Sequence, residues 1–384
     1  MPVFFYRSLW PLVIALVTVS VCMAQLTNPR NIPYRWQTDT TKKNIELEEL
    51  KVAVPKGAFP KIDYPRFLSK TEAENMFLAE EPVIAVAIKG HAKAYPLSIL
   101  TVHEISNDTL NGEAILLTYC PLCNSGIVYH RAVQINGKSL VLEFEVSGML
   151  RNSDMIMYDR KTESWWQQLT GEALVGELTD ASLNVIPSMI ISVEAFFEGY
   201  PNGKILSKMN GDLRAQKQYG KNYYEQYDNE NALPYAMFFA HDKIDQRLKP
   251  MERVVEIKGR YSYKIYPFKL FAHEGVIQDN HEGLEVLIFY RKGALSVVDH
   301  QEIAHSKDIG MATVFDARLN GKKLKFVKKG DFFIDDGTHS RWTIAGKCIA
   351  GSMKGEQLNM IPHTNHFAFA SLSFFPDAKI YTGK

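Results

Sequence analysis

The sequence has little excess charge, few cysteines and no recognisable catalytic signature. Its 384 residues include 44 Lys and Arg against 43 Asp and Glu. A chain this close to neutral lacks the electrostatic drive to displace counterions from a nucleic acid, so we expect no nucleic-acid partner. We find no Ser-His-Asp order, phosphate-binding loop or dinucleotide fingerprint. With 46% hydrophobic and 23% charged residues, disorder as the main state is also excluded.

Long apolar runs are also lacking, except at the N-terminus. Arg7 precedes an apolar stretch over residues 9–21, which ends in Cys22-Met23-Ala24. This pattern predicts a signal peptide over residues 1–24 and a secreted or periplasmic protein that begins at Gln25. Two alternatives are an uncleaved anchor, since the run approaches the length that spans a bilayer, and lipid attachment at Cys22. After cleavage, we expect no membrane span.

Two stretches of the chain repeat the same residues in the same order. Tyr95-Pro96 is echoed by Tyr266-Pro267, and His103-Glu104 by His273-Glu274. At one constant offset, Asp159, Thr162, Ser164 and Trp166 match Asp335, Thr338, Ser340 and Trp342. The repeats predict two tandem copies of one domain, over residues 83–206 and 253–381. Residues 25–82 then form a lead segment, and residues 207–252 a tyrosine-rich connector whose tyrosines we expect to pack rather than bind.

The local patterns predict an α+β, β-rich fold in which each copy is a mainly antiparallel β domain with short helices. Short aliphatic and aromatic runs flank Asn111-Gly112, Asn136-Gly137 and Asn320-Gly321. Asn-Gly between two such runs favours a type I′ hairpin, because both residues tolerate positive φ. Helical patterns are short, at residues 69–78, 97–105 and 193–199.

The copies differ where chemistry can reside. The second copy is longer at the place where the first carries Cys120 and Cys123, and the first copy is longer around residues 147–154. Duplicated domains often keep the function in one copy. We therefore expect the first copy to be the working half and the second to be a scaffold.

Three segments carry a family resemblance. They are Tyr119-Cys120-Pro121-Leu122-Cys123, residues 157–166 from Met-Tyr-Asp-Arg to Trp-Trp, and residues 367–377. Together they resemble the prokaryotic family known as domain of unknown function 3179, over nearly the whole mature chain. The resemblance implies family membership and carries no established activity. Asn124 stands where the family usually has Gly, and Asn tolerates the left-handed region better than most residues.

The first interpretation of the cysteine pair is a metal site. Two thiolates two residues apart can converge on one ion. His103 precedes the strand that leads into the motif and is a candidate third ligand, although a core or helix-capping histidine is the alternative. Met149, Met155 and Met157 are also close in sequence, and a set of Cys, His and Met suits copper, whereas Cys and His suit zinc.

Two other interpretations stay open. Cys-Pro-X-Cys resembles the motif of thioredoxin-like oxidoreductases, in which a helix N-terminus lowers the pKa of the first thiol. Residues 125–129 predict a strand in that place instead, so thiol redox chemistry would need another fold. The third interpretation is a structural disulfide in a non-catalytic secreted binding module. The sequence names neither a ligand nor a substrate, and it does not decide whether the protein is an enzyme.

Several polar and apolar residues near the longer loop can line a pocket with the cysteines. They are Met149, Asn152, Asp154, Met157, Trp166 and Gln168. Trp166 recurs as Trp342, which favours a core position. His363 and His366 have no acidic neighbour in sequence, so we expect them to be solvated or to cap a helix. Cys348 aligns with Ala173, which favours a buried, inert thiol.

Overall fold

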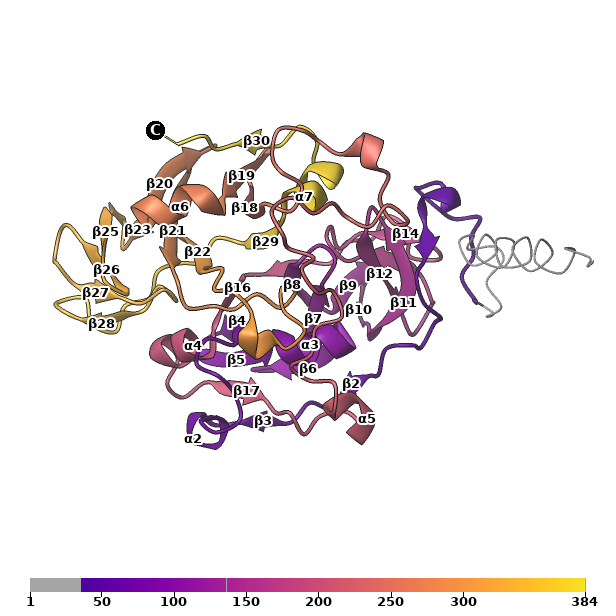
Figure 1. Ribbon diagram of the computed structural model, residues 1–384, viewed down its shortest axis with the longest axis horizontal. Helices are drawn as coiled ribbons and strands as arrows, with labels where there is room; N and C mark the ends of the chain where they lie inside the picture. The colour runs from indigo at the N-terminus through magenta and orange to yellow at the C-terminus, as the bar shows by residue number, and fades with distance from the viewer. Residues whose placement is uncertain (1–35, 136, 384) are drawn as a thin grey trace, which may run out of the picture.

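The computed structural model describes residues 36–383 with the exception of residue 136, and it is β-rich, with 41% strand and 13% helix. The expected signal peptide over residues 1–24 lies outside the described residues. Among these residues, none of the helices is long and apolar enough to cross a bilayer. The expectation of a β-rich fold with mainly antiparallel sheets and few short helices is confirmed (Figure 1).

Three sheets and one hairpin make up the first half of the described chain. One sheet has the order β16 (Ser188–Ser192), β4 (Pro82–Ile88), β5 (His91–Pro96), β17 (Lys204–Leu206), β3 (Phe67–Leu68). The second has the order β15 (Val185–Ile186), β8 (Ser125–His130), β7 (Glu113–Cys120), β6 (Ile105–Leu110), β2 (Ile62–Asp63). The third has the order β1 (Lys51–Val52), β11 (Phe144–Arg151), β12 (Asp154–Asp159), β13 (Trp165–Gln167), β14 (Ala173–Val175). The hairpin is β9 (Ala132–Ile135) with β10 (Lys138–Val141).

The second half presents its strands in a similar order. One sheet has the order β29 (His363–Phe367), β18 (Arg253–Lys258), β19 (Tyr263–Pro267), β30 (Lys379–Ile380). The next has the order β20 (Val276–His281), β21 (Leu284–Arg291), β22 (Met311–Asp316). The last has the order β25 (Phe326–Lys329), β26 (Phe332–Asp335), β27 (Arg341–Trp342), β28 (Cys348–Ala350). Its hairpin is β23 (Arg318–Leu319) with β24 (Lys322–Lys323). Pairing is antiparallel except for β17 with β5, β30 with β19 and β2 with β6.

Helices are short and lie between strands. They are α2 (Lys70–Ala73), α3 (Leu97–His103), α4 (Val193–Gly199), α5 (Leu213–Gln216), α6 (Phe268–Glu274) and α7 (Ala368–Phe374), with 3-10 turns η2 (Leu47–Glu49), η3 (His241–Lys243) and η4 (Ile303–His305). The helices expected near residues 97–105 and 193–199 are present as α3 and α4, whereas only the four residues of α2 are helical in the one expected over 69–78. At two expected hairpin turns, Asn111 and Asn320 have φ of 49° and 50°, and the glycine after each is also left-handed, as a type I′ turn requires.

The ends of α3 and α6 correct one of the sequence matches. Each helix follows a Tyr-Pro pair and ends in a left-handed residue, which is Glu104 after α3 and Gly275 after α6. The structural counterpart of Glu104 is therefore Gly275 and not Glu274, so the echo of His103-Glu104 in His273-Glu274 is shifted by one residue. Glu104 thus stands where the second half has glycine, the residue that adopts a positive φ without steric cost.

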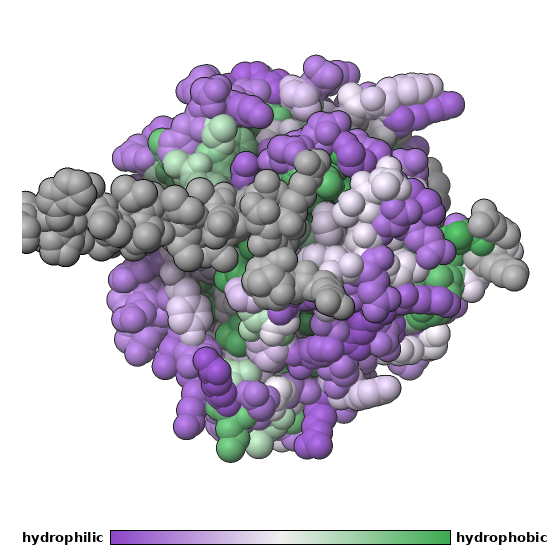
Figure 2. All heavy atoms as spheres, turned by 90° about the vertical axis from the view of Figure 1, so that its right-hand side faces the viewer, coloured by the Kyte–Doolittle hydropathy of each residue, from purple (hydrophilic) through white to green (hydrophobic). Residues whose placement is uncertain are grey.

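The two halves share their hydrophobic cores. The largest cluster of buried residues joins the strands around Tyr119 to Phe367 and Phe369 near the end of the chain. A second cluster joins Val83 and Phe196 to Phe315 and other residues of the second half. Burial of this kind supplies most of the folding free energy, so each half completes its core with residues of the other. On the face drawn in Figure 2, hydrophilic residues predominate and hydrophobic ones form small separate areas.

Candidate functional site

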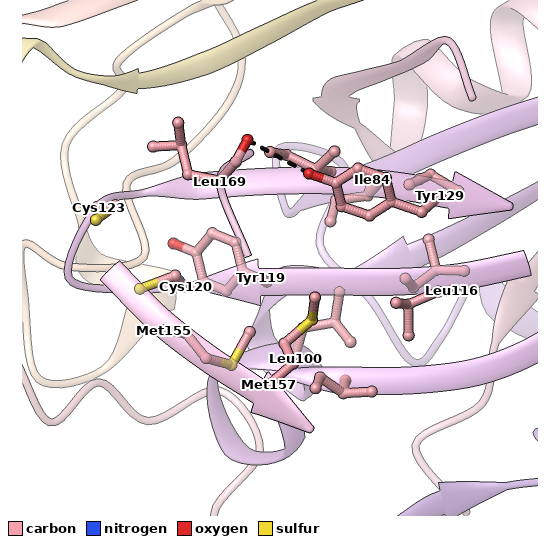
Figure 3. Close-up of a cluster of buried hydrophobic side chains, with 14 of the residues drawn as sticks. Ile84, Leu100, Leu116, Tyr119, Cys120, Cys123, Tyr129, Met155, Met157 and Leu169 are labelled. Carbon is pink, nitrogen blue, oxygen red and sulfur yellow. Dashed lines mark hydrogen bonds between the residues drawn. The ribbon is translucent and has the colours of Figure 1, made fainter. Parts of the chain in front are cut away.

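The cysteine pair lies in a four-residue turn between two central strands. Cys120 ends β7 and pairs with Ser125 at the start of β8, so the expected strand after the motif is present. Asn124 has a φ of 53°, and its backbone N–H donates to the carbonyl of Pro121 at 3.1 Å. Asn124 thus adopts the left-handed conformation that asparagine tolerates, and the turn forms without the family's usual glycine. Both sulfurs lie at one end of the β7–β8 pair (Figure 3).

The extra residues of the first half bring a second turn to the cysteines. Strands β11 and β12 are longer than β25 and β26, which precede the corresponding Trp342, and a two-residue turn of Asn152 and Ser153 joins them. Both turn residues are left-handed, with φ of 50° and 63°. The carbonyl oxygen of Ser153 lies 3.4 Å from Cys123 Sγ and 3.9 Å from Cys120 Sγ, and each thiol donates to it. The longer hairpin therefore serves to reach the cysteine turn.

Asp154, the first residue of β12, completes a group of three possible metal ligands. One carboxylate oxygen of Asp154 and the sulfurs of Cys120 and Cys123 all lie within 4.8 Å of one another, and all three residues are buried. Oδ2 of Asp154 accepts hydrogen bonds from Gln167 Nε2 at 2.6 Å and from the Leu169 N–H at 3.0 Å. Oδ1 makes no hydrogen bond of regular geometry, although the Cys123 thiol lies close enough to the carboxyl to oppose the rise in its pKa. Two donors thus orient a carboxylate whose other oxygen is buried and makes no such bond.

Burial controls the protonation of this group. It raises the pKa of both thiols, and for Cys123 the neighbouring Cys120 raises the pKa further. Burial also raises the pKa of Asp154 to about 6, against the opposing hydrogen bonds from Gln167 and Leu169. Without a cation, the charged forms of all three groups are disfavoured, because little solvent compensates them. The cysteines approach to 4.1 Å and are free thiols, since a disulfide needs sulfurs at about 2.05 Å.

Glu104 places a second carboxyl group near the site, and the sequence patterns did not point to it. Its side chain is buried, and burial together with the charge of Asp154 raises its pKa to about 8. It occupies the left-handed position after α3, with a φ of 56°. A non-glycine residue there is strained, and strain concentrates at functional sites. The only signal in the sequence was the Gly275 of the second half at the matching place, which a one-residue shift concealed.

His103 lies elsewhere. Its Nδ1 is hydrogen-bonded to the Pro60 carbonyl at 2.8 Å and its Nε2 to the Tyr219 hydroxyl at 2.6 Å. The side chain is buried, and it does not belong to the group of ligand atoms around the cysteines. These contacts are those of the core histidine that the sequence left as the alternative.

The other predicted pocket residues lie in different parts of the first half. Met157 and Met155 share the core cluster of the cysteines (Figure 3). Met149 packs in a separate cluster with Leu47 and Tyr158. Trp166 is fully buried and donates its indole N–H to Asp159 at 3.1 Å, a core position. Asn152 forms the hairpin tip.

Gln168 links the β7–β8 pair to the segment that follows β13 through buried hydrogen bonds. Its Nε2 donates to Thr118 Oγ1 at 2.9 Å, and its Oε1 accepts from the Ser125 hydroxyl at 2.7 Å. Both partners belong to the β7–β8 pair. Gln168 therefore joins the strand segment after Trp166 to the base of the motif.

The second half and the connector also reach the site. The N–H of Phe367 donates to the Cys123 carbonyl at 3.0 Å, and the preceding His366 is fully buried on β29. His363 is buried on the same strand, so the expectation that both histidines are solvated or capping is wrong, because β29 packs beside β8 in the centre of the molecule. Tyr227 of the connector is also buried beside the site. Burial raises the pKa of its hydroxyl, and the charges of the two cysteines raise that pKa further.

The comparisons with known proteins place the chain in one family. The family described as "Protein of unknown function (DUF3179)" matches residues 56–378, most of the chain, and the protein belongs to it. No curated protein and no solved structure matches.

Proposed function

We propose that this member of the DUF3179 family binds a metal ion, with zinc preferred over copper, between Cys120, Cys123 and Asp154. The observation that carries the proposal is the convergence of three buried ligand atoms within 4.8 Å, one of them from a carboxylate with an unpartnered oxygen. Buried polar atoms are rarely left without a partner, and a cation is a partner that all three groups accept.

Geometry and charge both agree with zinc. Two thiolates on one tetrahedral zinc, each at about 2.3 Å, are separated by about 3.8 Å, close to the 4.1 Å between these cysteines. A divalent ion would reverse the effect of burial, since it stabilises the thiolates and the carboxylate that the interior otherwise disfavours. Copper(I) prefers soft ligands, and a carboxylate is hard, so the Asp154 oxygen favours zinc.

In this proposal Asp154 takes the role first given to His103, because both ring nitrogens of His103 are already hydrogen-bonded. Three protein ligands leave a fourth position for water or a substrate, which is the arrangement of catalytic zinc sites rather than of closed structural ones. The ordered hydrogen bonds of Asp154 to Gln167 and Leu169 are the kind of outer contact that orients a metal ligand.

Metal analysis of protein purified without chelator tests the proposal. We expect about one zinc per chain for the wild type, and loss of the metal from Cys120→Ser/Cys123→Ser and from Asp154→Asn. Cys348→Ser is the matched control, because Cys348 is also a buried free thiol but lies outside the ligand group. Absence of bound metal after incubation of the reduced protein with zinc would reject the proposal.

Thiol redox chemistry is the second candidate, and the two free thiols only 4.1 Å apart favour it. Attack on a substrate disulfide would join Cys120 to Cys123 and release two substrate thiols, with Asp154 placed to accept a thiol proton. The redox candidate predicts that mild oxidation removes two titratable thiols without prior release of metal. In the rival binding module, the same two cysteines would already be closed as a disulfide in protein purified under air.

Two further proposals concern the whole chain. We infer export through a signal peptide over residues 1–24, which the intact mass of secreted protein tests. We also infer tandem copies at residues 83–206 and 253–381, with the lead segment and connector as given above. The corresponding sheet orders support duplication, as does the indole N–H of Trp342, which donates to Asp335 just as Trp166 donates to Asp159. Superposition of an experimental structure of each half would test it.

A further inference from the structure

A large cleft lies at the other end of β7 from the cysteines. Its volume is ≈ 960 Å³, within the range of sites that hold small molecules. It is lined by the tip of the β6–β7 hairpin at Leu110 and Asn111, whereas Cys120 ends the opposite end of β7. A strand of this length spans about 25 Å, so the cleft is separate from the cysteine site.

The charged residues that line the cleft are all basic. They are Lys89, Lys93, Lys204 and Lys347, His91 lies among them, and no aspartate or glutamate is among the described residues of the lining. The whole chain has almost equal numbers of acidic and basic residues, so this separation of charge is local. A concave surface with charge of one sign concentrates ligands of the opposite sign.

Nearby acids neutralise only part of this charge. Lys93 binds Asp108 at 2.6 Å, and the exposed Lys89 lies 3.5 Å from Glu113. Lys204 is paired directly with Lys93 across the parallel strands β17 and β5, which places two like charges side by side. Like charges placed opposite each other destabilise a sheet, and Asp108 beside Lys93 and Glu72 near Lys204 relieve part of this repulsion. Lys347 adds a further ammonium group from the second half, where its Nζ contacts the Gly355 carbonyl.

Uncharged groups in the cleft indicate which kind of anion would fit. Asn111, Asn202 and Asn359 all line it, and each amide can both donate and accept hydrogen bonds. Lysines bind carboxylates, while amides bind hydroxyl groups, and an acidic saccharide carries both. We propose that this cleft binds a carboxylated oligosaccharide, held between the two halves of the chain. The proposal is independent of the metal or redox role of the cysteines.

Calorimetric titration of the full-length protein with trigalacturonate tests this site, with maltotriose as the neutral sugar. We expect trigalacturonate to bind, with an affinity that falls as salt is raised, and maltotriose to bind at least about tenfold more weakly. No binding of trigalacturonate, or equal affinity for the two sugars, would overturn the proposal.

A pair of charge-matched variants locates the binding. Lys204→Ala/Lys347→Ala should weaken trigalacturonate binding about tenfold or more, because two ammonium groups leave the cleft. Lys161→Ala/Lys322→Ala removes the same net charge from exposed lysines outside the lining and should bind like the wild type. Equal affinity of the two variants would refute the assignment to this cleft. Unchanged thermal melting of both variants verifies that each is folded.

Discussion

The carbonyl oxygen of Ser153 lies 3.4 Å from the sulfur of Cys123, and this contact joins two turns that are 30 residues apart in the sequence. One turn carries the cysteines, and the other is the tip of the β11–β12 hairpin, directly before Asp154. The position of Asp154 relative to the thiols therefore depends on the conformation of Asn152 and Ser153. Their left-handed backbone is part of the site.

The first prediction concerns this turn. Ser153→Gly should bind metal like the wild type and melt at the same temperature or slightly higher, because glycine adopts a φ of 63° without strain. Ser153→Val should lower the melting temperature and the metal content, since a β-branched residue disfavours positive φ. Metal analysis and calorimetry of both variants check this, and equal behaviour of Gly and Val would show that the turn does not position the site.

The second prediction concerns Glu104 and pH. Burial raises its pKa to about 8 from an ordinary 4.5, so the folded protein holds a proton that the unfolded chain releases between these values. The stabilisation is fully present below pH 4.5, falls as the pH rises from there through about 8, and changes no further at higher pH, where both states are ionised. In metal-free protein, Glu104→Gln should reduce this alkaline loss of stability by several kcal/mol, at about 1.4 kcal/mol for each unit of pKa.

Urea unfolding of both proteins at several pH values measures the effect. Glu302→Gln is the control, because Glu302 is exposed and should leave the pH dependence unchanged. Parallel curves for the wild type and Glu104→Gln would mean that Glu104 is not protonated in the folded state.

The third prediction concerns Gln168. Gln168→Ala should destabilise the protein by about 2–4 kcal/mol, because it leaves the buried Ser125 hydroxyl without an acceptor and removes a donor from Thr118, which keeps its bond to the Ile127 carbonyl. It should also lower metal content, since both partners belong to the strands that carry the cysteines. Gln216→Ala, at a partly exposed glutamine on α5 whose side chain bonds the Gly211 carbonyl, is the control and should change stability much less. An unchanged melting temperature of Gln168→Ala would show that these hydrogen bonds do not hold the two segments together.

The fourth prediction is that the first half does not fold alone. Its core cluster includes Phe367 and Phe369 from the end of the chain, so a fragment of residues 36–206 would expose that apolar surface. We expect this fragment to be unfolded or aggregated by circular dichroism and gel filtration, and to be rescued by co-expression of residues 207–384. A monomeric, cooperatively melting fragment would disprove the shared core.

The sequence alone determined the local structure of this protein. Apolar runs and Asn-Gly pairs specify strands and turns through short-range forces, and so β-rich antiparallel structure and the cysteines at a strand end followed from the chain itself. The family assignment also followed, from residues 119–123, 157–166 and 367–377. The extra residues around 147–154 marked the region that reaches the cysteines.

Only the tertiary structure decided which side chains meet. His103 was near the cysteines in sequence, but Pro60 and Tyr219 bind both of its ring nitrogens, and these partners come from distant segments. Asp154, Glu104 and His366 instead approach the cysteine turn through a long hairpin, a strained helix end and a strand from the other half. Distances between side chains on different elements depend on how sheets pack, and that packing is a property of the whole core rather than of any short segment.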